Sequence, residues 1–278
     1  MEEKNGKKII ARLLDMFFKC FLIVCFAFPF YWMIITAFKT NGEALRFPPT
    51  MWPKEIIWGN FKKAIDSVPF FTYYRNTIIV SVSVTVLQFV FVVPAAYGFA
   101  KYKFRGSNVL FAIVLLSFML PQQLTFVPAY LMFSKLGMID SLWPQILPFV
   151  SNGFGIFLLR QYFMQIPEEI IEAARLDDAN EAKIILKVMM PMCKSAISAV
   201  AMLQFISMWN AYFWPLIMTS NDKYRTLSIG VAMLNSPEGG TEWPVLMAAC
   251  LMMILPILLA YVVANKKITS AFVYRGIK

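Results

Sequence analysis

The sequence predicts an all-α protein that crosses a membrane several times. Of its 278 residues, 59% are hydrophobic and only 15% are charged, whereas soluble domains average about 45–50% apolar and 25% charged residues. The apolar residues also cluster in long uncharged runs, and the charges fall between these runs. A single soluble core does not bury such an excess, so composition and patterning together indicate an integral membrane protein.

Six uncharged runs define the predicted transmembrane helices. Each run has at least 19 residues, and a helix of about 20 apolar residues spans the hydrocarbon core of a bilayer. The runs are 20–38, 76–100, 106–134, 141–159, 195–221 and 243–265. We expect the first run to be retained as a helix, because Lys39 and a polar loop follow it rather than a small-residue cleavage site.

The distribution of positive charges orients these helices. With six helices both termini lie on one side, and that side carries 17 of the 26 Lys and Arg residues, against 9 on the other. Because Lys and Arg are enriched in cytoplasmic loops, we expect both termini, 101–105 and 160–194 to be cytoplasmic. The segment 39–75 is then an outward-facing cap of a multi-pass membrane protein.

Composition also excludes several classes of function. The chain has no histidine, so it builds neither a Ser-His-Asp triad nor a histidine-ligated metal centre. The net charge of +10 is not gathered into a basic stripe with aromatic residues, so we expect no nucleic-acid partner. The four cysteines lack the spacing of a disulfide framework or a thiolate metal site. They are Cys20, Cys25, Cys193 and Cys250.

Polar side chains at membrane depth suggest a path for a solute. Uncharged polar groups are costly in a bilayer unless they face a bundle interior or a wet cavity. The candidates for a translocation path are Gln122, Gln123, Asn152, Gln204, Trp209 and Asn210. The alternative is that such groups only join helices to one another, each contributing about 0.6 kcal/mol, and the sequence leaves both interpretations open.

One charged segment interrupts the apolar sequence between the fourth and fifth runs. Pro167, followed by Glu168 and Glu169, predicts the start of a short helix, since proline needs no donor there and carboxylates favour the positive end of the helix dipole. The small residues Ala173 and Ala174 would let this helix approach another surface closely. A turn with a cap for a second helix should follow, and the alternative is a solvated amphipathic connector.

This segment resembles a known motif. The EAA signature of ATP-binding-cassette (ABC) importer permeases has EAA, three residues, Gly, nine residues, Ile, one residue and Leu-Pro. The same spacing occurs here in Glu172-Ala173-Ala174, Asp178, Val188 and Met190-Pro191. Asp178 stands where the family has glycine, and we expect the turn to persist because Asp tolerates the left-handed conformation better than most residues.

The resemblance extends along nearly the whole chain. Several strings are similar to carbohydrate permeases, particularly the maltose-type second permease subunit. They include Trp58-Gly59-Asn60-Phe61, Pro94-Ala95-Ala96-Tyr97-Gly98, Met119-Leu120-Pro121-Gln122, Trp209-Asn210 and Gly276-Ile277-Lys278. The resemblance implies the type I ABC importer permease fold, with six transmembrane helices and a cytoplasmic coupling helix. It divides the chain into a tail, first helix and outer cap (1–71), a permease core with the EAA loop 166–191 (72–265) and a carboxy-terminal tail (266–278).

The resemblance also implies a place in the plasma membrane of a prokaryote, and it implies partners and sites. The partners would be a homologous second permease subunit, two cytoplasmic ABC ATPase subunits, an extracytoplasmic solute-binding protein and the lipid bilayer. The chain has no Walker A sequence, so ATP and Mg would be bound by the ATPase subunits. Coupling to the ATPase would involve Glu172, Ala173, Ala174, Arg175, Asp177 and Asp178. Contact with the binding protein would involve Asn221, Pro237, Glu238, Gly239 and Gly240.

The implied function is that of a permease subunit in an ATP-driven importer of a sugar or oligosaccharide, in which closure of the ATPase drives alternating access. The chain itself would not be an enzyme. A permease of the same family for glycerol phosphate or a polyamine stays open, since the composition of the spans does not reject it. An ion-coupled secondary transporter is disfavoured, because it usually needs charged residues within its spans and these runs contain none.

Overall fold

The computed structural model describes residues 2–235 and 240–273, with side chains at 12–235 and 240–262. Helices and no strand are present within these ranges, which confirms the predicted class. The chain divides into two compact units that are not continuous in sequence. Unit 1 contains Met1–Val68 and Val231–Ile254, and unit 2 contains Pro69–Gly230 and Leu255–Lys278. The first boundary is close to the one expected at residue 71, whereas unit 1 also takes in a segment that we assigned to the permease core.

Unit 1 is built from α1 (Glu2–Ala37), α2 (Asn41–Ala44), α3 (Gly59–Asp66), the end of α14 (Leu227–Met233) and the first part of α15 (Trp243–Val273). Ala64 of α3 packs in a small core with Val245 and Ala249 of α15. The Asn60 side-chain amide donates to the carbonyls of Ala37 and Lys39, at 2.8 and 2.9 Å. These bonds satisfy carbonyls at the end of α1, which helical hydrogen bonding leaves without donors.

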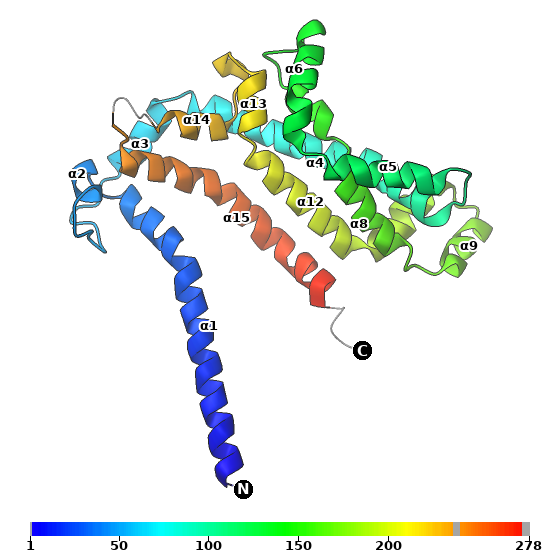
Figure 1. Ribbon diagram of the computed structural model, residues 1–278, viewed down its shortest axis with the longest axis horizontal. Helices are drawn as coiled ribbons and strands as arrows, with labels where there is room; N and C mark the ends of the chain where they lie inside the picture. Colours follow the sequence, from blue (N-terminus) through cyan, green and yellow to red (C-terminus); the bar gives the residue numbers. More distant parts are fainter. Residues whose placement is uncertain (1, 236–239, 274–278) are drawn as a thin grey trace. The chain divides into compact units, whose positions relative to one another are not determined.

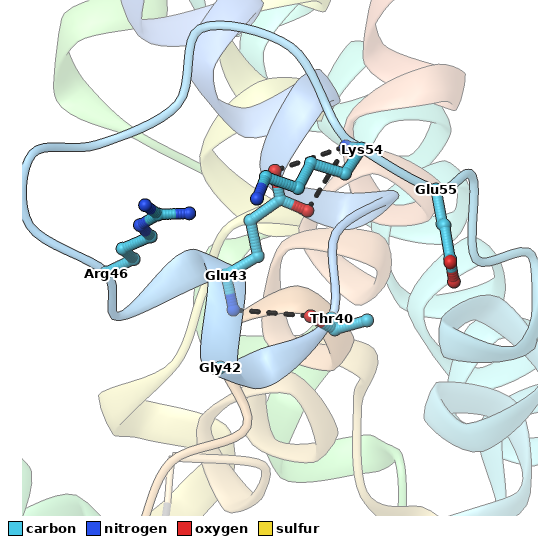
Figure 2. A pocket seen from close by; sticks show the side chains of 6 residues that line it. All are labelled: Thr40, Gly42, Glu43, Arg46, Lys54 and Glu55. Atoms are coloured by element: carbon cyan, nitrogen blue, oxygen red, sulfur yellow. Dashed lines mark hydrogen bonds between the residues drawn. The ribbon is translucent and has the colours of Figure 1, made fainter.

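The cap that follows α1 is an ordered loop rather than a plain connection. The loop has a hollow of about 380 Å³, and Figure 2 shows side chains that line it, among them Thr40, Glu43, Arg46 and Lys54. The Glu43 carboxylate accepts a hydrogen bond from the Thr50 hydroxyl at 2.7 Å and from the Lys54 backbone N–H at 3.2 Å. Glu43 therefore holds the two sides of the loop together.

Unit 2 is organised around α4 (Phe70–Lys101), which runs alongside α8 (Gly153–Phe163) and α12 (Lys194–Trp209) (Figure 1). The other elements are α5 (Ser107–Met119), η1 (Gln122–Thr125), α6 (Phe126–Lys135), α7 (Trp143–Ile146), η2 (Leu147–Phe149), α9 (Glu168–Leu176), α10 (Glu181–Ile184), η3 (Ile185–Met189), α11 (Met190–Met192), α13 (Phe213–Met218) and η4 (Asp222–Tyr224).

Two glycines allow the close approach of α8 to its neighbours. A Cβ atom at Gly153 would lie 2.6 Å from the Val114 carbonyl oxygen of α5, and one at Gly155 would lie 3.1 Å from Val92 of α4. Small residues at such positions let helices in a membrane pack backbone to backbone. The sequence Asn152-Gly153-Phe154-Gly155 therefore sets the spacing of α4, α5 and α8.

The structure corrects the boundaries of the predicted spans. Within the described residues, α1 (from Arg12), α4 and α15 (to Val262) are continuous helices long and apolar enough to cross a membrane, and two bent pairs raise the number of candidate spans to five. The third run bends by 95° between α5 and the Gln122–Lys135 segment, because Pro121 holds Leu120 in an extended conformation.

The fourth and fifth runs are also interrupted. The run 141–159 is divided into α7, η2 and α8, since Pro144 and Pro148 break the first part and Asn152 caps a new helix. The fifth helix is α12, which bends by 89° from the Glu181–Met192 segment and ends at Trp209. Proline and side-chain capping explain why long apolar runs do not form single helices here.

Candidate functional site

The predicted charged helix is α9, and it has two distinct faces. Pro167 precedes it, and Glu168 and Glu169 occupy its first turn, which confirms the predicted helix start. Ile171 is fully buried and joins the apolar core of unit 2. The opposite side is open: Glu172 and Ala173 are exposed, and Leu176 at the end of the helix is 86% exposed. An exposed leucine beside small residues is a surface suited to contact with another protein.

The turn after α9 places Asp178 in the left-handed conformation, with φ at +54°. The Ala179 N–H donates to the Ala174 carbonyl and the Asp178 N–H donates to the Arg175 carbonyl, both at 3.1 Å. This pair of bonds is a Schellman motif, in which glycine is the usual residue at the left-handed position. The structure therefore places Asp178 in a conformation that glycine adopts freely, which is a physical reason for a glycine at this position of the EAA signature. Asp177 ends α9 with an ordinary φ of −85°.

A network of polar contacts joins this turn to the end of α4. The Glu181 carboxylate accepts a hydrogen bond from the Tyr97 hydroxyl at 2.6 Å and from Arg175 Nε at 3.2 Å. The Arg175 guanidinium also lies 6.0 Å from the centre of the Tyr102 ring. Burial, together with the nearby Glu181 carboxylate, raises the pKa of Tyr102, so its hydroxyl stays protonated at neutral pH. Glu181 thus links α9, α10 and α4.

Two further cations fix the same end of unit 2. The ammonium of Lys101 donates to the Ile166 carbonyl at 2.5 Å and lies 3.4 Å from the Glu168 carboxylate. Arg160 Nε donates to the Phe99 carbonyl at 3.1 Å. Hydrogen bonds that involve charged groups are stronger than neutral ones, so these contacts hold the end of α4 to the start of α9 and to α8.

The segment after α10 contains a π-helical turn, η3. The Met190 N–H donates to the Ile185 carbonyl five residues earlier. Pro191 has no N–H and would collide with the carbonyl of the preceding turn in a regular helix, so the wider turn accommodates it. Ile184 and Met189 are fully buried in the same core as Ile171. The Val188, Met190 and Pro191 part of the motif is therefore structural and carries the connection from the turn to α12.

A second site lies elsewhere in unit 2, where two hollows of about 310 and 470 Å³ share six lining residues. The smaller is lined by Gln122, Asn152 and Gln204, and the larger by Gln122 and Gln123. Four of the six candidates for a translocation path thus line one joined space, which we name the polar cavity. The breaks before η1 and α8 bring these side chains together.

The polar side of this cavity is formed by amides and hydroxyls. Asn152 accepts a hydrogen bond from the Gly155 N–H at 2.5 Å and donates to the Gln204 side-chain carbonyl at 3.0 Å. Gln88 of α4 lies beside Gly155 and is 1% exposed. Neither of its amide atoms has a hydrogen-bond partner in the part of the chain that the structure describes. A buried amide without a partner is costly, which is unusual for a purely structural helix contact.

The other side of the polar cavity is aromatic. The Trp214 ring centre lies 5.4 Å from that of Phe126 and 5.9 Å from that of Phe149, and all three residues line the cavity. The Trp214 indole N–H donates to the Pro144 carbonyl at 2.7 Å, which fixes the orientation of the ring. These three rings form an apolar aromatic wall within the lining, which also contains the polar side chains.

Comparisons with known proteins agree with a role for this chain in transport across a membrane. Residues 92–270 match the family described as the binding-protein-dependent transport system inner membrane component. The chain belongs to this family. It is therefore a membrane component of a transport system and not an enzyme.

Individual relatives cover almost the whole permease. The sn-glycerol-3-phosphate transport system permease protein UgpE of Pectobacterium atrosepticum is 31% identical over 92% of this chain and 94% of its own length. The arabinooligosaccharides transport system permease protein AraQ of Bacillus subtilis is 30% identical over 97% and 96%. A chain in the crystal structure of a bacterial ABC transporter involved in the import of the acidic polysaccharide alginate is 26% identical, with a TM-score of 0.81 over 94% of this chain and 97% of that one.

The remaining two path candidates lie outside the lining of the polar cavity. Trp209 is 1% exposed and packs against Phe205 and Tyr74, with ring centres 5.5 and 5.8 Å away. The Asn210 side-chain amide donates to the Ile206 carbonyl at 2.9 Å, so it caps the end of α12. Both side chains thus contact other residues of unit 2, and their place in a translocation path stays a prediction.

The candidates for binding-protein contact are only partly described. Pro237, Glu238 and Gly239 lie outside the described residues. Gly240 has a φ of +80°. Asn221 is exposed, and the Asp140 carboxylate accepts a hydrogen bond from its backbone N–H at 2.8 Å. Asp140 therefore holds the start of this segment in place.

The first part of the segment between Asn221 and Glu242, up to Gly230, is folded into unit 2. The Asn76 amide donates to the carbonyls of Lys223 and Arg225, both at 2.9 Å. The Leu227 N–H donates to the Thr77 hydroxyl at 2.8 Å, and Leu227 begins the helix α14. The run of apolar residues from Leu227 onward is the signal that would have indicated this helix.

The anchoring residues on α4 and α8 were not predicted. Tyr97 bonds Glu181 of α10, Lys101 and Tyr102 contact the start and the end of α9, and Arg160 joins α8 to α4. A cation in the last turn of a span is a recognisable feature, but it indicates a helix end rather than a partner. The pairing of Tyr97 with Glu181 joins positions 84 residues apart, so no local pattern reveals it.

Proposed function

We propose that this permease subunit belongs to an ATP-driven importer of a sugar or oligosaccharide. Its function would be to convert closure of an ATPase into alternating access for the solute. The resemblance to AraQ, named for arabinooligosaccharide transport, and to a chain of the alginate importer supports a carbohydrate. The resemblance to UgpE supports glycerol phosphate as a second candidate.

The single observation that carries the coupling proposal is the construction of α9. Its exposed side, with Glu172, Ala173 and Leu176, is free to dock on an ATPase subunit. Arg175 near its end is joined to α4 through Glu181 and Tyr97. Because the helix is held by charged hydrogen bonds on one side only, a displacement imposed on the docked face would move α4 with it.

The helix α4 would carry this motion along the subunit. Tyr97 lies near one end of α4 and Asn76 near the other, and a helix rises by 1.5 Å per residue. Asn76 holds the Lys223–Arg225 segment, which follows the proposed binding-protein contact at Asn221. A single rigid helix thus connects the proposed docking site for the ATPase with the proposed contact for the binding protein.

The partners in this proposal are a second permease subunit, two ABC ATPase subunits that bind ATP and Mg, and a solute-binding protein outside the membrane. The termini, 101–105 and 160–194 would be cytoplasmic. Labelling with a membrane-impermeant thiol reagent in intact cells, with the four native cysteines replaced, tests the orientation. Asn41→Cys should react and Lys103→Cys should not, and the opposite pattern would contradict the proposed topology.

Substitution on the exposed face of α9 tests the coupling proposal. Ala173→Arg places a long cation where a partner would approach, and Glu172→Lys reverses a charge on the same face. Both should abolish uptake of radiolabelled solute and reduce copurification of the ATPase, while the amount of permease in the membrane stays normal. Ala173 is a better probe than Ala174, because Ala174 packs partly against the core.

The matched control is Gln165→Arg, which introduces the same cation at an exposed position before α9. It should leave both uptake and ATPase binding close to wild type. Full uptake with Ala173→Arg would remove the coupling proposal. If the variant lost uptake but still bound a normal amount of ATPase, the substitution would affect a step that follows docking of the ATPase.

A further inference from the structure

We propose that the polar cavity is a binding site for neutral saccharide units of the transported solute, and that it discriminates against phosphates and uronates. This inference rests on the proposed function of sugar import and specifies the substrate class. The lining comes from η1, α6, η2, α12, α13 and the residues just before α8, all in one unit. The two joined hollows, of about 310 and 470 Å³, fall in the range of about 300–1,000 Å³ that small-molecule sites occupy.

The charge of the lining excludes an anionic ligand. None of the described residues that line either hollow is Lys, Arg, Asp or Glu. Removing a phosphate or carboxylate from water without a cation beside it is strongly unfavourable. A neutral polyhydroxylated ligand carries no such penalty, because hydroxyl groups need only hydrogen-bond partners.

The cavity lining contains side chains that can hydrogen-bond to hydroxyl groups and that lack partners among the described residues. Gln122 and Ser207 line both hollows, and neither side chain has a hydrogen-bond partner among the described residues. The side-chain carbonyl of Gln204 accepts a bond from Asn152, which leaves the Gln204 NH₂ group free to donate to a ligand. A site with such unpaired groups strongly prefers ligands that supply the matching hydroxyls.

Besides hydrogen-bonding groups, a saccharide site needs a flat apolar surface for the sugar ring, and the aromatic wall provides it. The face of an aromatic ring is electronegative, and the C–H groups on one face of a sugar ring are weakly electropositive. Trp214 is held in a single orientation by its bond to Pro144, and Phe126 and Phe149 extend the same surface. A sugar ring stacked here would direct its hydroxyls towards Gln204 and Ser207.

Direct binding to the complete importer without its binding protein tests the inference. The complex would be purified in nanodiscs and titrated with radiolabelled arabinotriose, maltotriose and xylotriose, and with trigalacturonate and sn-glycerol 3-phosphate. We expect at least one neutral trisaccharide to bind and neither anion to bind. Ser207→Ala should weaken that binding roughly five- to tenfold, since it removes one hydrogen bond.

A charge placed in the cavity gives the sharper test. Ser207→Lys should weaken neutral trisaccharide binding at least tenfold and permit trigalacturonate to bind. Ser198→Ala and Ser198→Lys make the same changes on the same helix outside the cavity lining, and both should behave as wild type. Binding of an anion by the unaltered complex would overturn the inference, as would neutral binding that Ser207→Ala and Ser207→Lys leave unchanged.

Uptake by the importer with its binding protein separates the two proposals. If no trisaccharide binds the complex but cells still import a carbohydrate, the cavity inference is wrong and the proposed function stands. If cells import no carbohydrate through this system, the proposed function itself fails.

Discussion

The α9 end of unit 2 and the polar cavity use polar side chains in opposite ways. At the α9 end, Glu181, Arg175 and Lys101 are charged and paired with one another or with backbone carbonyls. In the cavity and beside it, Gln88, Gln122 and Ser207 are neutral and lack partners among the described residues. Paired charges hold elements in one geometry, whereas unpaired neutral groups are available to exchange partners. The difference fits the two proposed roles, in which one region transmits movement and the other receives the solute.

The largest expected effect comes from breaking the paired region at its centre. Glu181→Ala removes the acceptor shared by Tyr97 and Arg175, and leaves the hydroxyl of the buried Tyr97 without that bond. Hydrogen bonds to charged groups contribute about 1.5–3 kcal/mol, so we expect uptake to fall at least tenfold. Copurification should show that the ATPase is still bound, since the exposed face of α9 is unchanged.

Glu169→Ala is the control for this variant, because Glu169 is an exposed glutamate of α9. Its uptake should stay within twofold of wild type. If the Glu181→Ala variant took up solute at the wild-type rate, the contact between α9 and α4 through Glu181 would not transmit the movement of α9.

A smaller effect is expected from the left-handed turn. Asp178→Val places a β-branched residue at a φ of +54°, which costs about 1–2 kcal/mol, and uptake should fall several-fold. Asp178→Gly should retain or raise uptake, because glycine adopts this conformation freely. Asp177→Val makes the same substitution at a φ of −85° and should have little effect. Equal uptake by the Asp178→Val and Asp178→Gly variants would contradict a role for this conformation.

On the cavity side, the close approach of α8 to α5 predicts a loss of stability. Gly153→Ala places a Cβ atom 2.6 Å from the Val114 carbonyl oxygen, and overpacking of this kind costs about 1–3 kcal/mol. The melting temperature of the purified complex should fall by a few degrees. Gly98→Ala is the matched control, since nothing lies within 4 Å of the added atom. It should leave the melting temperature unchanged or raise it.

The smallest effect should come from Asn152, which both caps α8 and contacts Gln204. Asn152→Ala should destabilise the complex by about 1 kcal/mol, whereas Asn152→Ser keeps a capping oxygen and should cost less. Thermal unfolding distinguishes the two variants. If both lower the melting temperature equally, the bridge to Gln204 rather than the cap is the important contact.

The sequence alone determined what depends on local chemistry. Long uncharged runs predicted a helical membrane protein, Pro167 with two glutamates predicted the start of α9, and the spacing of the EAA signature placed Asp178 in the turn. These features follow from hydropathy, from the missing N–H of proline and from backbone sterics. Each involves residues close together in the chain, and a single sequence is sufficient to recognise them.

Only the tertiary structure decided which distant residues meet. The pairing of Glu181 with Tyr97, the union of Gln122 with Gln204 in one cavity and the hydrogen bond from Leu227 to Thr77 all join separate parts of the chain. The packing of Trp209 against Tyr74 likewise joins residues far apart in the sequence, and no local pattern predicts it. The physical reason is that breaks at Pro121 and Asn152 redirect the helices, and the contacts follow from that geometry rather than from any local pattern.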